Sequence, residues 1–262
     1  MILTVDIGNT NICIALHEND DPKALFFERL HTTAEKDPQE FYEDILTILS
    51  LHHRTPSELD GIVLSSVVPP ATAVMTEALN LLKDSIDGKD VNFLTVRHDL
   101  KFTFRNGAED PSSVGSDILC DITGALSRFA PPLMVIDMGT ATVLSVINEE
   151  PAFVGVFICP GVRTSLNSLA ATTSALPSIG IDVPDNVIGT NTNDSMKSGI
   201  IYGSAGLIDG IVNHVEEATG KKYTIVATGG LSGSVIPYCR HEIHHDPELL
   251  MTGLWNIYKN NV

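Results

Sequence analysis

ILTVDIGNTNICI, residues 2–14, and LMVIDMGTATVLS, residues 133–145, decide the fold, because the second stretch repeats the pattern of the first. Each has an apolar run that ends in an aspartate, Asp6 or Asp137, followed by a glycine-containing turn and a second apolar run. The two aspartates are 131 positions apart in a chain of 262 residues. Self-similarity at half the chain length indicates a duplicated domain, so we predict one domain over residues 1–130 and a second over residues 131–262.

The elements around the first copy follow from apolar runs and turn residues. Three close runs broken by turns predict a strand meander, and alternating helices and strands follow it. The predicted order is βββαβαβα, which implies an α/β fold with a mixed sheet and helices on both faces. Strands are expected at residues 2–6, 12–16, 24–30, 61–66 and 91–96, and helices after Pro38 and at residues 71–82 and 113–128.

The second half begins in the same way and is predicted to repeat this architecture. Its long helix is expected to have Asn193 as N-cap, and its last helix to begin at Asp246 and Pro247, since Asp is a favoured cap and Pro suits the first turn. Strands are expected at residues 133–137, 141–147, 153–158 and 223–227, and the other helices at residues 164–171 and 194–217.

Composition excludes several classes of protein. With 16 Lys+Arg against 33 Asp+Glu, the net charge is −17, which argues against nucleic-acid binding driven by counterion release. No apolar run reaches the roughly 18 residues of a membrane span, and the first residues lack the basic start of a signal peptide. The four cysteines are scattered without a CxxC pair, as in reduced cytoplasmic proteins. We therefore expect a cytoplasmic protein without nucleic-acid or membrane partners.

The repeated hairpins have the chemistry of a phosphate site. Glycine lets the backbone approach a ligand, turn N–H groups can bind phosphate oxygens, and Thr10 and Thr140 add hydroxyl donors. An aspartate beside phosphates calls for a cation, so Asp6 and Asp137 are candidate metal ligands. Two such hairpins facing across a cleft, with the turn at residues 228–230 as a nucleotide contact, would bind ATP. The alternative, two ordinary hairpins, accounts less well for a matched pair.

Many short motifs in the same order resemble the type III pantothenate kinase family, within the superfamily of acetate and sugar kinases, Hsp70 and actin. The resemblance spans nearly the whole chain. Its motifs are DIGNTN (6–11), SVVP (66–69), GSD (115–117), DMGTAT (137–142), ICPG (158–161), ALP (175–177), IGTNT (188–192), SG (198–199), ATGG (227–230), DP (246–247), GL (253–254) and Asn260.

This resemblance implies two similar ribonuclease H-like domains of the actin-like ATPase superfamily and the ATP-dependent phosphorylation of pantothenate, the first step of coenzyme A synthesis. It implies Mg²⁺-ATP, a monovalent cation (K⁺ or NH₄⁺) and a homodimer with the substrate pocket at the subunit interface. The implied cofactor-binding residues are Asp6, Ile7, Gly8, Asn9, Thr10, Asn11, Ile12, Cys13, Thr140, Gly229 and Gly230. The implied metal ligands are Asp6, near the metal-bound phosphates, and Asp137, for the monovalent cation.

On the substrate side, Asp117 matches the general base that accepts the proton of the pantothenate hydroxyl. It lies just inside a predicted helix, and a helix N-terminus favours the ionised carboxylate that such a base needs. Thr192 matches a substrate contact, reached from the neighbouring subunit. The other expected substrate-binding residues are Gly115, Ser116, Ile118 and Arg163.

Three departures from the family pattern fall near the substrate. Ile118 stands where the family usually has an arginine suited to a carboxylate, residues 106–111 lack the usual aromatic, and Val156 replaces the second of two glycines. Arg163 is a candidate replacement cation. The departures leave open an ATP-binding paralogue without the kinase activity, and a kinase for another hydroxyl compound is a further alternative. A transcription-accessory role is suggested only by names that some relatives have carried. Separately, residues 239–245 hold soft ligands that could form a zinc site.

Overall fold

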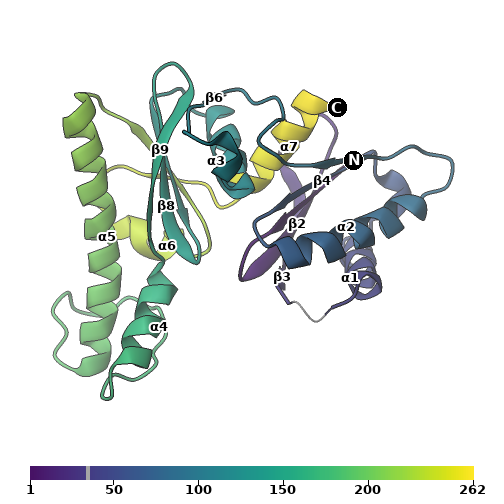
Figure 1. Cartoon of the computed structure of the whole chain (residues 1–262). Coiled ribbons are helices and arrows are strands. Elements are labelled where there is room, and N and C mark those ends of the chain that lie inside the picture. The colour runs from purple at the N-terminus through teal and green to yellow at the C-terminus, as the bar shows by residue number, and fades with distance from the viewer. Residues whose placement is uncertain (34–35) are drawn as a thin grey trace. The chain divides into compact units, whose positions relative to one another are not determined.

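The computed structural model describes residues 1–33 and 36–262, which divide into two compact units (Figure 1). The first unit holds Met1–Thr103, Glu109–Ser127 and Glu248–Val262, and the second holds Phe104–Ala108 and Arg128–Pro247. The end of the chain thus belongs to the first unit. A boundary of the duplicated domains at residues 130 and 131 describes the sequence repeat and stays a prediction.

Five strands form the mixed sheet of the first unit, in the order β3-β2-β1-β4-β5. Strands β1, β2 and β3 are an antiparallel meander, whereas β4 and β5 run parallel to β1. Parallel neighbours need a crossover, and helices supply it here. The strands are β1 (Ile2–Ile7), β2 (Asn11–His17), β3 (Ala24–His31), β4 (Gly61–Ser66) and β5 (Asn92–Thr95).

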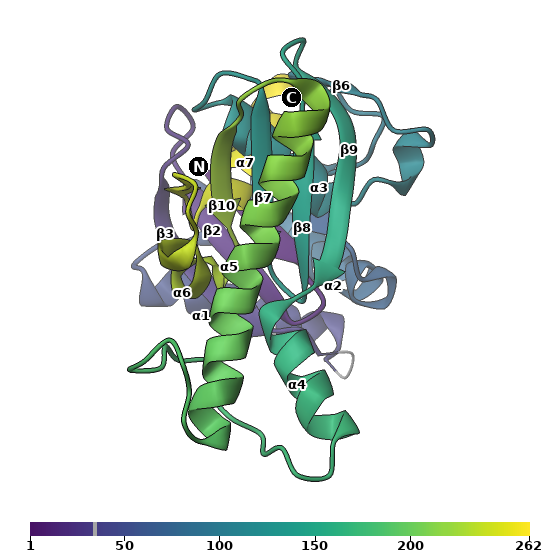
Figure 2. The ribbon, with the colours of Figure 1, turned by 90° about the vertical axis from the view of Figure 1, so that its left-hand side faces the viewer.

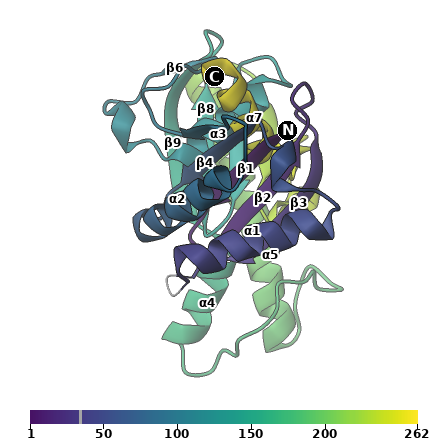
Figure 3. The ribbon, with the colours of Figure 1, turned by 90° about the vertical axis from the view of Figure 1, so that its right-hand side faces the viewer.

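Helices cover both faces of this sheet because successive strand residues point to opposite sides. Leu3 and Val5 pack in the apolar cluster with α1 and α2, which lie in front of the sheet in Figure 3. Thr4, between them, points to the other face, where its hydroxyl is 3.3 Å from the Met251 sulfur of α7. The helices are α1 (Pro38–Leu51), α2 (Pro69–Asp84), α3 (Ser116–Leu126) and α7 (Leu249–Asn261), with 3₁₀ turns η1 (Pro56–Glu58) and η2 (Pro111–Ser113).

The second unit has a sheet of the order β11-β10-β7-β8-β9-β6. Its long helix α5 lies along one face of this sheet (Figure 2), where Ile201 and Ile208 pack with Met134 and Ile136 of β7. The strands are β6 (Arg105–Asn106), β7 (Leu133–Met138), β8 (Ala141–Ile147), β9 (Ala152–Pro160), β10 (Thr224–Thr228) and β11 (His244–His245). The helices are α4 (Val162–Thr172), α5 (Thr192–Thr219), α6 (Ser232–Val235) and the 3₁₀ turn η3 (Ile236–Tyr238).

The repeat seen in the sequence is also a repeat of pairing. Asp6 at the end of β1 pairs with Cys13 of the antiparallel β2 and with Ser65 of the parallel β4. Asp137 of β7 has the same neighbours, Val143 of the antiparallel β8 and Thr228 of the parallel β10. The predicted α/β fold with two similar halves is confirmed.

The structure corrects several helix starts. α5 begins at Thr192, and its N-cap is Asn191, whose side chain accepts the N–H of Asp194 at 3.0 Å, rather than Asn193. α7 begins at Leu249, not at Asp246, because the Asp246 carboxylate forms an ion pair with Arg128 instead of a cap. α3 begins at Ser116, after the separate turn η2. The short strands β6 and β11 were not predicted, since two residues carry no periodicity.

The helices in the described part of the chain do not have the character of membrane-spanning segments. None of them combines the length and the apolar character that spanning a bilayer requires.

Candidate active site

The β1–β2 hairpin places its turn at the surface and its flanking side chains in the core. Gly8 donates its N–H to the carbonyl of Asn11 at 3.0 Å, and the Thr32 hydroxyl donates to the Gly8 carbonyl at 2.7 Å. Asn9 and Thr10 are exposed, whereas Asp6 is buried at the strand end. The turn is therefore fixed, with two polar residues at its surface.

Not every residue of the predicted phosphate loop has its side chain at that surface. Ile7 and Ile12 are both 0% exposed and belong to the apolar core, so only their backbone groups remain for a ligand. Cys13 and Asn11 are half-buried. The exposed side chains of the loop are therefore those of Asn9 and Thr10, and Gly8 can offer only its backbone to a ligand.

Asp117 lies in the first turn of α3, close to the end of β4. Its Oδ1 accepts the N–H of Ile118 at 2.8 Å. A Cβ added to Gly115 would lie 2.3 Å from that oxygen, so the glycine N-cap makes room for the carboxylate. The position of Asp117 thus depends on a small residue two places before it.

The pKa of Asp117 is shifted in the direction opposite to the one that a helix N-terminus favours. Burial raises the pKa of its carboxyl, and the hydrogen bond from the Ile118 N–H opposes this without reversing it. The local rule, that a helix N-terminus favours the ionised form, is therefore outweighed by desolvation. A carboxyl with a raised pKa holds a proton more readily, which suits a group that must accept one.

Asp121 is a residue that the sequence reasoning missed. It is 3% exposed and lies four positions after Asp117, so both are on one face of α3. Between them, Cys120 is fully buried, and burial followed by the charges of Asp6 and Asp121 raises the pKa of its thiol well above the usual value. The thiol is therefore neutral, and carboxylates from β1 and α3 lie near it. The spacing of four on a predicted helix was the available signal for Asp121.

The β7–β8 hairpin and the turn at residues 228–230 lie together in the second unit. Gly229 has φ +91°, and a Cβ there would lie 2.4 Å from the Asp137 Oδ1, so only glycine fits beside this carboxylate. The Thr140 carbonyl accepts the Thr164 hydroxyl at 2.7 Å and the Gly161 N–H at 3.2 Å. The Thr140 side chain is exposed, and Gly230 is exposed next to Gly229.

Carboxylate oxygen is the donor type that Mg²⁺ and K⁺ take in proteins, so Asp6 and Asp137 fit the ions expected of them. For Asp137, the backbone of Gly229 lies so close to the carboxylate that a Cβ there would be 2.4 Å from Oδ1. For Asp6, the fixed turn beside it could bind phosphates, and a metal held by Asp6 would bind to the same phosphates. Within the described residues, no three metal-ligating side chains gather into a cluster that would hold a metal by themselves.

Thr192, an expected substrate contact, lines a cavity of about 750 Å³ between α4 and α5. The walls combine apolar side chains such as Leu166 and Met196 with polar groups at the start of α5. Arg163 is exposed in the first turn of α4 and is not among the lining residues of this cavity. The structure therefore gives Thr192 a cavity but does not bring Arg163 into it.

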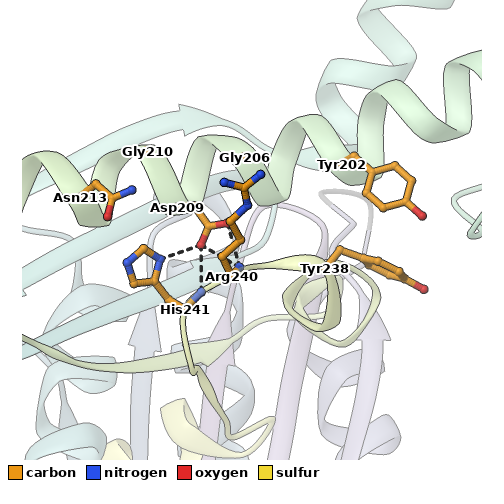
Figure 4. Close-up of a pocket in the computed structure, with 8 residues that line it drawn as sticks. All are labelled: Tyr202, Gly206, Asp209, Gly210, Asn213, Tyr238, Arg240 and His241. Atoms are coloured by element: carbon orange, nitrogen blue, oxygen red, sulfur yellow. Dashed lines mark hydrogen bonds and ion pairs between the residues drawn. The ribbon is translucent and has the colours of Figure 1, made fainter. Parts of the chain in front are cut away.

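The zinc alternative at residues 239–245 finds no support, because the candidate ligands have other partners. His241 Nδ1 is 2.7 Å from the Asp209 carboxylate, which also accepts the Arg240 backbone N–H at 2.9 Å (Figure 4). Burial tends to raise the pKa of Asp209, but these hydrogen bonds lower it overall. His245 Nε2 lies 2.9 Å from the Ser232 hydroxyl. Asp209 thus fixes the loop that borders a cavity of about 660 Å³ beside α5.

The departures from the family pattern occupy ordinary structural positions. Ile118 is half-buried in α3 and gives Asp117 its backbone N–H. Val156 is half-buried in β9, where it pairs with Ser145 of β8. Neither position is distorted to accept its side chain, so both replacements are compatible with the fold.

Comparison with known proteins adds independent information. A family model described as type III pantothenate kinase matches residues 2–214. A type III pantothenate kinase of Geobacillus sp. (strain WCH70) is 32% identical over 267 residues, covering 100% of this chain and 98% of that protein. Another, of Dictyoglomus turgidum, is 33% identical over 264 residues and is covered completely, as is this chain.

A solved Sinorhizobium meliloti structure, described as a 2-dehydro-3-deoxygalactonokinase protein, has a TM-score of 0.60 at 12% identity. The alignment covers 99% of this chain and 98% of that one. At this identity the likeness concerns the fold alone, which is that of the sugar kinases.

Proposed function

Since the chain belongs to the type III pantothenate kinase family, it is an ATP-dependent kinase that phosphorylates pantothenate in coenzyme A biosynthesis, and we propose that Asp117 is its general base. The carboxylate accepts the proton of the pantothenate hydroxyl while the hydroxyl oxygen bonds to the γ-phosphorus of ATP. The bond from that phosphorus to the bridging oxygen breaks, and ADP leaves with the electron pair. Phosphoryl transfer asks the protein mainly for alignment, charge neutralisation and such a base.

Each hairpin has its own part in binding ATP. In the first unit, the N–H groups and side chains of residues 8–11 bind phosphate oxygens, and Asp6 holds Mg²⁺ through its carboxylate. In the second unit, Asp137 holds the monovalent cation, while Thr140, Gly229 and Gly230 contact the nucleotide. When bound, the two ions neutralise negative charge on the phosphates. The fixed turns support this assignment, because a phosphate site gains from groups that are already in place.

The substrate side includes Gly115, Ile118 and Thr192, and the enzyme works as a homodimer in the cytoplasm. Thr192 supports the dimer, because it lies exposed on a cavity of the second unit, where a neighbouring subunit can reach it. Cys120, Cys159 and Cys239 are thiols, which agrees with a reducing compartment. Arg163 is a weaker candidate for the pantothenate carboxylate, since it lies outside the cavity that contains Thr192.

The observation that carries the assignment of the base is the half-buried Asp117 carboxyl with its raised pKa at the start of α3. We expect Asp117→Asn to lower kcat by about 10²- to 10⁴-fold, the usual contribution of a positioned base. The measurement is ATP consumption with and without pantothenate, with K⁺ present. Asp117→Glu serves as the control that keeps a carboxylate.

The same variant has a stability readout with a definite sign. A folded-state pKa above the unfolded value means that the ionised carboxylate destabilises the fold at neutral pH. Asp117→Asn should therefore unfold at the same or a higher denaturant concentration at pH 7 while losing activity. An Asn variant that keeps full turnover would contradict the role of Asp117 as base.

A further inference from the structure

Four side-chain hydroxyls form a network where β4 ends and α2 and α3 begin. They belong to Ser65 and Ser66 at the end of β4, Thr72 in α2 and Ser116, the first residue of α3. All four lie in the first unit. The network joins three elements at the point from which Asp117 extends.

Ser116 uses its whole hydrogen-bonding capacity within this network. Its hydroxyl donates to the Ser66 carbonyl at 2.9 Å and accepts the Ser66 N–H at 3.1 Å. It also accepts the Ser65 hydroxyl at 3.0 Å. A serine hydroxyl has one hydrogen and two lone pairs, so nothing is left over for a ligand. This is at odds with the expectation that the Ser116 side chain binds substrate.

The hydrogen bonds of Ser116 matter because α3 lacks the usual side-chain cap. Its N-cap is Gly115, which has no side chain to accept a backbone N–H. Ser116 instead ties the first helical residue to both backbone groups of Ser66. Since Asp117 is the next residue, fixing Ser116 also fixes the Asp117 backbone, from which its side chain extends.

The strand end that holds Ser116 is itself fixed from the other side. The Thr72 hydroxyl lies 2.6 Å from the Ser66 hydroxyl and 2.9 Å from the Val68 carbonyl. The Ser66 hydroxyl in turn accepts the Val68 N–H at 3.2 Å. The first turn of α2 therefore supports the residue to which Ser116 is bound.

We propose that Ser116 is a positioning residue for phosphoryl transfer, which sets the place of the Asp117 carboxylate through its bonds to Ser65 and Ser66. This rests on the proposed role of Asp117 as general base. A displacement of a reacting group by about 1 Å can cost about 100-fold in rate. The hydroxyl therefore acts on kcat through Asp117 and makes no contact with pantothenate.

Three variants test the proposal, with kcat and KM measured for both substrates. Ser116→Ala should lower kcat about 10- to 100-fold and leave both KM values within about twofold. Ser116→Thr, which keeps the hydroxyl, should restore most of kcat. Ser127→Ala is the matched control at the other end of α3, where the hydroxyl donates only to the Gly124 carbonyl, and it should keep the wild-type kcat.

The outcomes separate the inference from the function on which it rests. A raised KM for pantothenate at unchanged kcat in Ser116→Ala would overturn the inference and make Ser116 a substrate contact. Full activity in Ser116→Ala with an inactive Asp117→Asn would overturn the positioning role alone. Full activity in Asp117→Asn would overturn the base itself.

If Ser116→Ala does not fold, Thr72→Val removes the support from the α2 side instead. It keeps the size of the side chain and deletes the hydroxyl that lies against Ser66. A lowered kcat at unchanged KM, restored by Thr72→Ser, supports the positioning network. Wild-type kinetics in a folded Thr72→Val would contradict it.

Discussion

Burial shifts the pKa of several single residues in the first unit. Asp117 and Cys120, three positions apart in α3, both have raised pKa values, and in both the first cause is loss of water. For the carboxyl this assists proton acceptance, and for the thiol it prevents ionisation. The consequence is that Cys120 fills space near the carboxylates without offering a nucleophile to ATP.

His17 extends this to the stability of the fold. It is 0% exposed in β2, where Nδ1 donates to the Pro22 carbonyl at 2.8 Å and Nε2 lies 3.1 Å from the Thr4 hydroxyl. Burial lowers the pKa of His17 from 6.5 to about 4, against the smaller opposing effects of Pro22 and Asp21. The folded protein therefore keeps this imidazole neutral at pH values where the unfolded chain protonates it.

We predict that His17 makes the fold less stable in mild acid. Because the folded pKa lies below the unfolded one, its contribution to stability is lost as the pH falls from 6.5 towards 4, by about 3 kcal/mol in total. Denaturant unfolding at pH 7 and at pH 5 measures the loss. His17→Gln, which cannot take up a proton, should show a smaller loss between the two pH values. An equal loss in both proteins would contradict this.

At the scale of elements, two glycines set the closeness of α3 and α7. A Cβ at Gly253 would lie 1.9 Å from the Cys120 carbonyl, and one at Gly124 would lie 2.3 Å from the Leu249 carbonyl. These close atoms are backbone, so they cannot move aside as a flexible side chain can. The contact between the helices therefore depends on the absence of side chains at both positions.

Gly253→Ala should destabilise the protein by about 1 to 3 kcal/mol, as overpacking does, despite the gain in helix propensity. The matched control is Gly203→Ala in α5, where no described atom outside the adjoining turns of its own helix lies within 4 Å of the added Cβ. The control should be neutral or slightly stabilising in the same denaturant titration. If both variants behaved alike, the close packing of α3 on α7 would not limit stability.

At the scale of the whole molecule, the duplication gives the proposed sites of the two ions the same hairpin. Asp6 and Asp137 hold equivalent sheet positions, but only Asp137 lies beside a glycine with a positive φ, Gly229. Asp6 instead shares its surroundings with carboxylates of α3 that are near Cys120. The two copies therefore differ in their surroundings, and we propose that Asp6 would hold the metal bound with phosphates and Asp137 the monovalent cation.

Asp137→Asn should therefore abolish the stimulation of ATP consumption by K⁺ and lower activity by about 100-fold, since one charged ligand is lost. The measurement is turnover in a KCl titration at constant ionic strength, with NaCl making up the difference. Asp6→Asn is the comparison, in which the Mg²⁺ requirement should change instead. If Asp137→Asn responded to K⁺ as the wild type does, the assignment of the monovalent site would be wrong.

The sequence was sufficient where local patterns determine structure. Repeated apolar runs ending in Asp6 and Asp137 predicted the two hairpins and the α/β architecture, because strand pairing there is between neighbours in the chain. The sequence did not predict the structure where contacts between distant residues determine it. Asp246 was predicted to cap a helix, but it forms an ion pair with Arg128, more than a hundred positions away.

The candidate site likewise has features that the sequence showed and features that only the tertiary structure shows. The motif around Asp117 was visible in the sequence, but the role of Ser116 depends on Ser65 and Ser66, about fifty positions earlier. The pKa of Asp117 likewise follows its burial, which no neighbour in the sequence reveals. The sequence named the candidate residues, which stay predictions, whereas the direction of the pKa shift and the anchoring of Asp117 follow from the tertiary structure.

The placement of α7 has a consequence for synthesis on the ribosome. Residues 249–261 pack on α3 and β1 of the first unit, yet they leave the ribosome after every residue of the second unit has been made. The usual sequence of events, in which the N-terminal domain matures first, is thus not open to this protein. The Asp117 carboxylate on α3, the proposed base, acquires its final surroundings only when translation has passed beyond residue 250, so we expect nascent chains without α7 to be inactive.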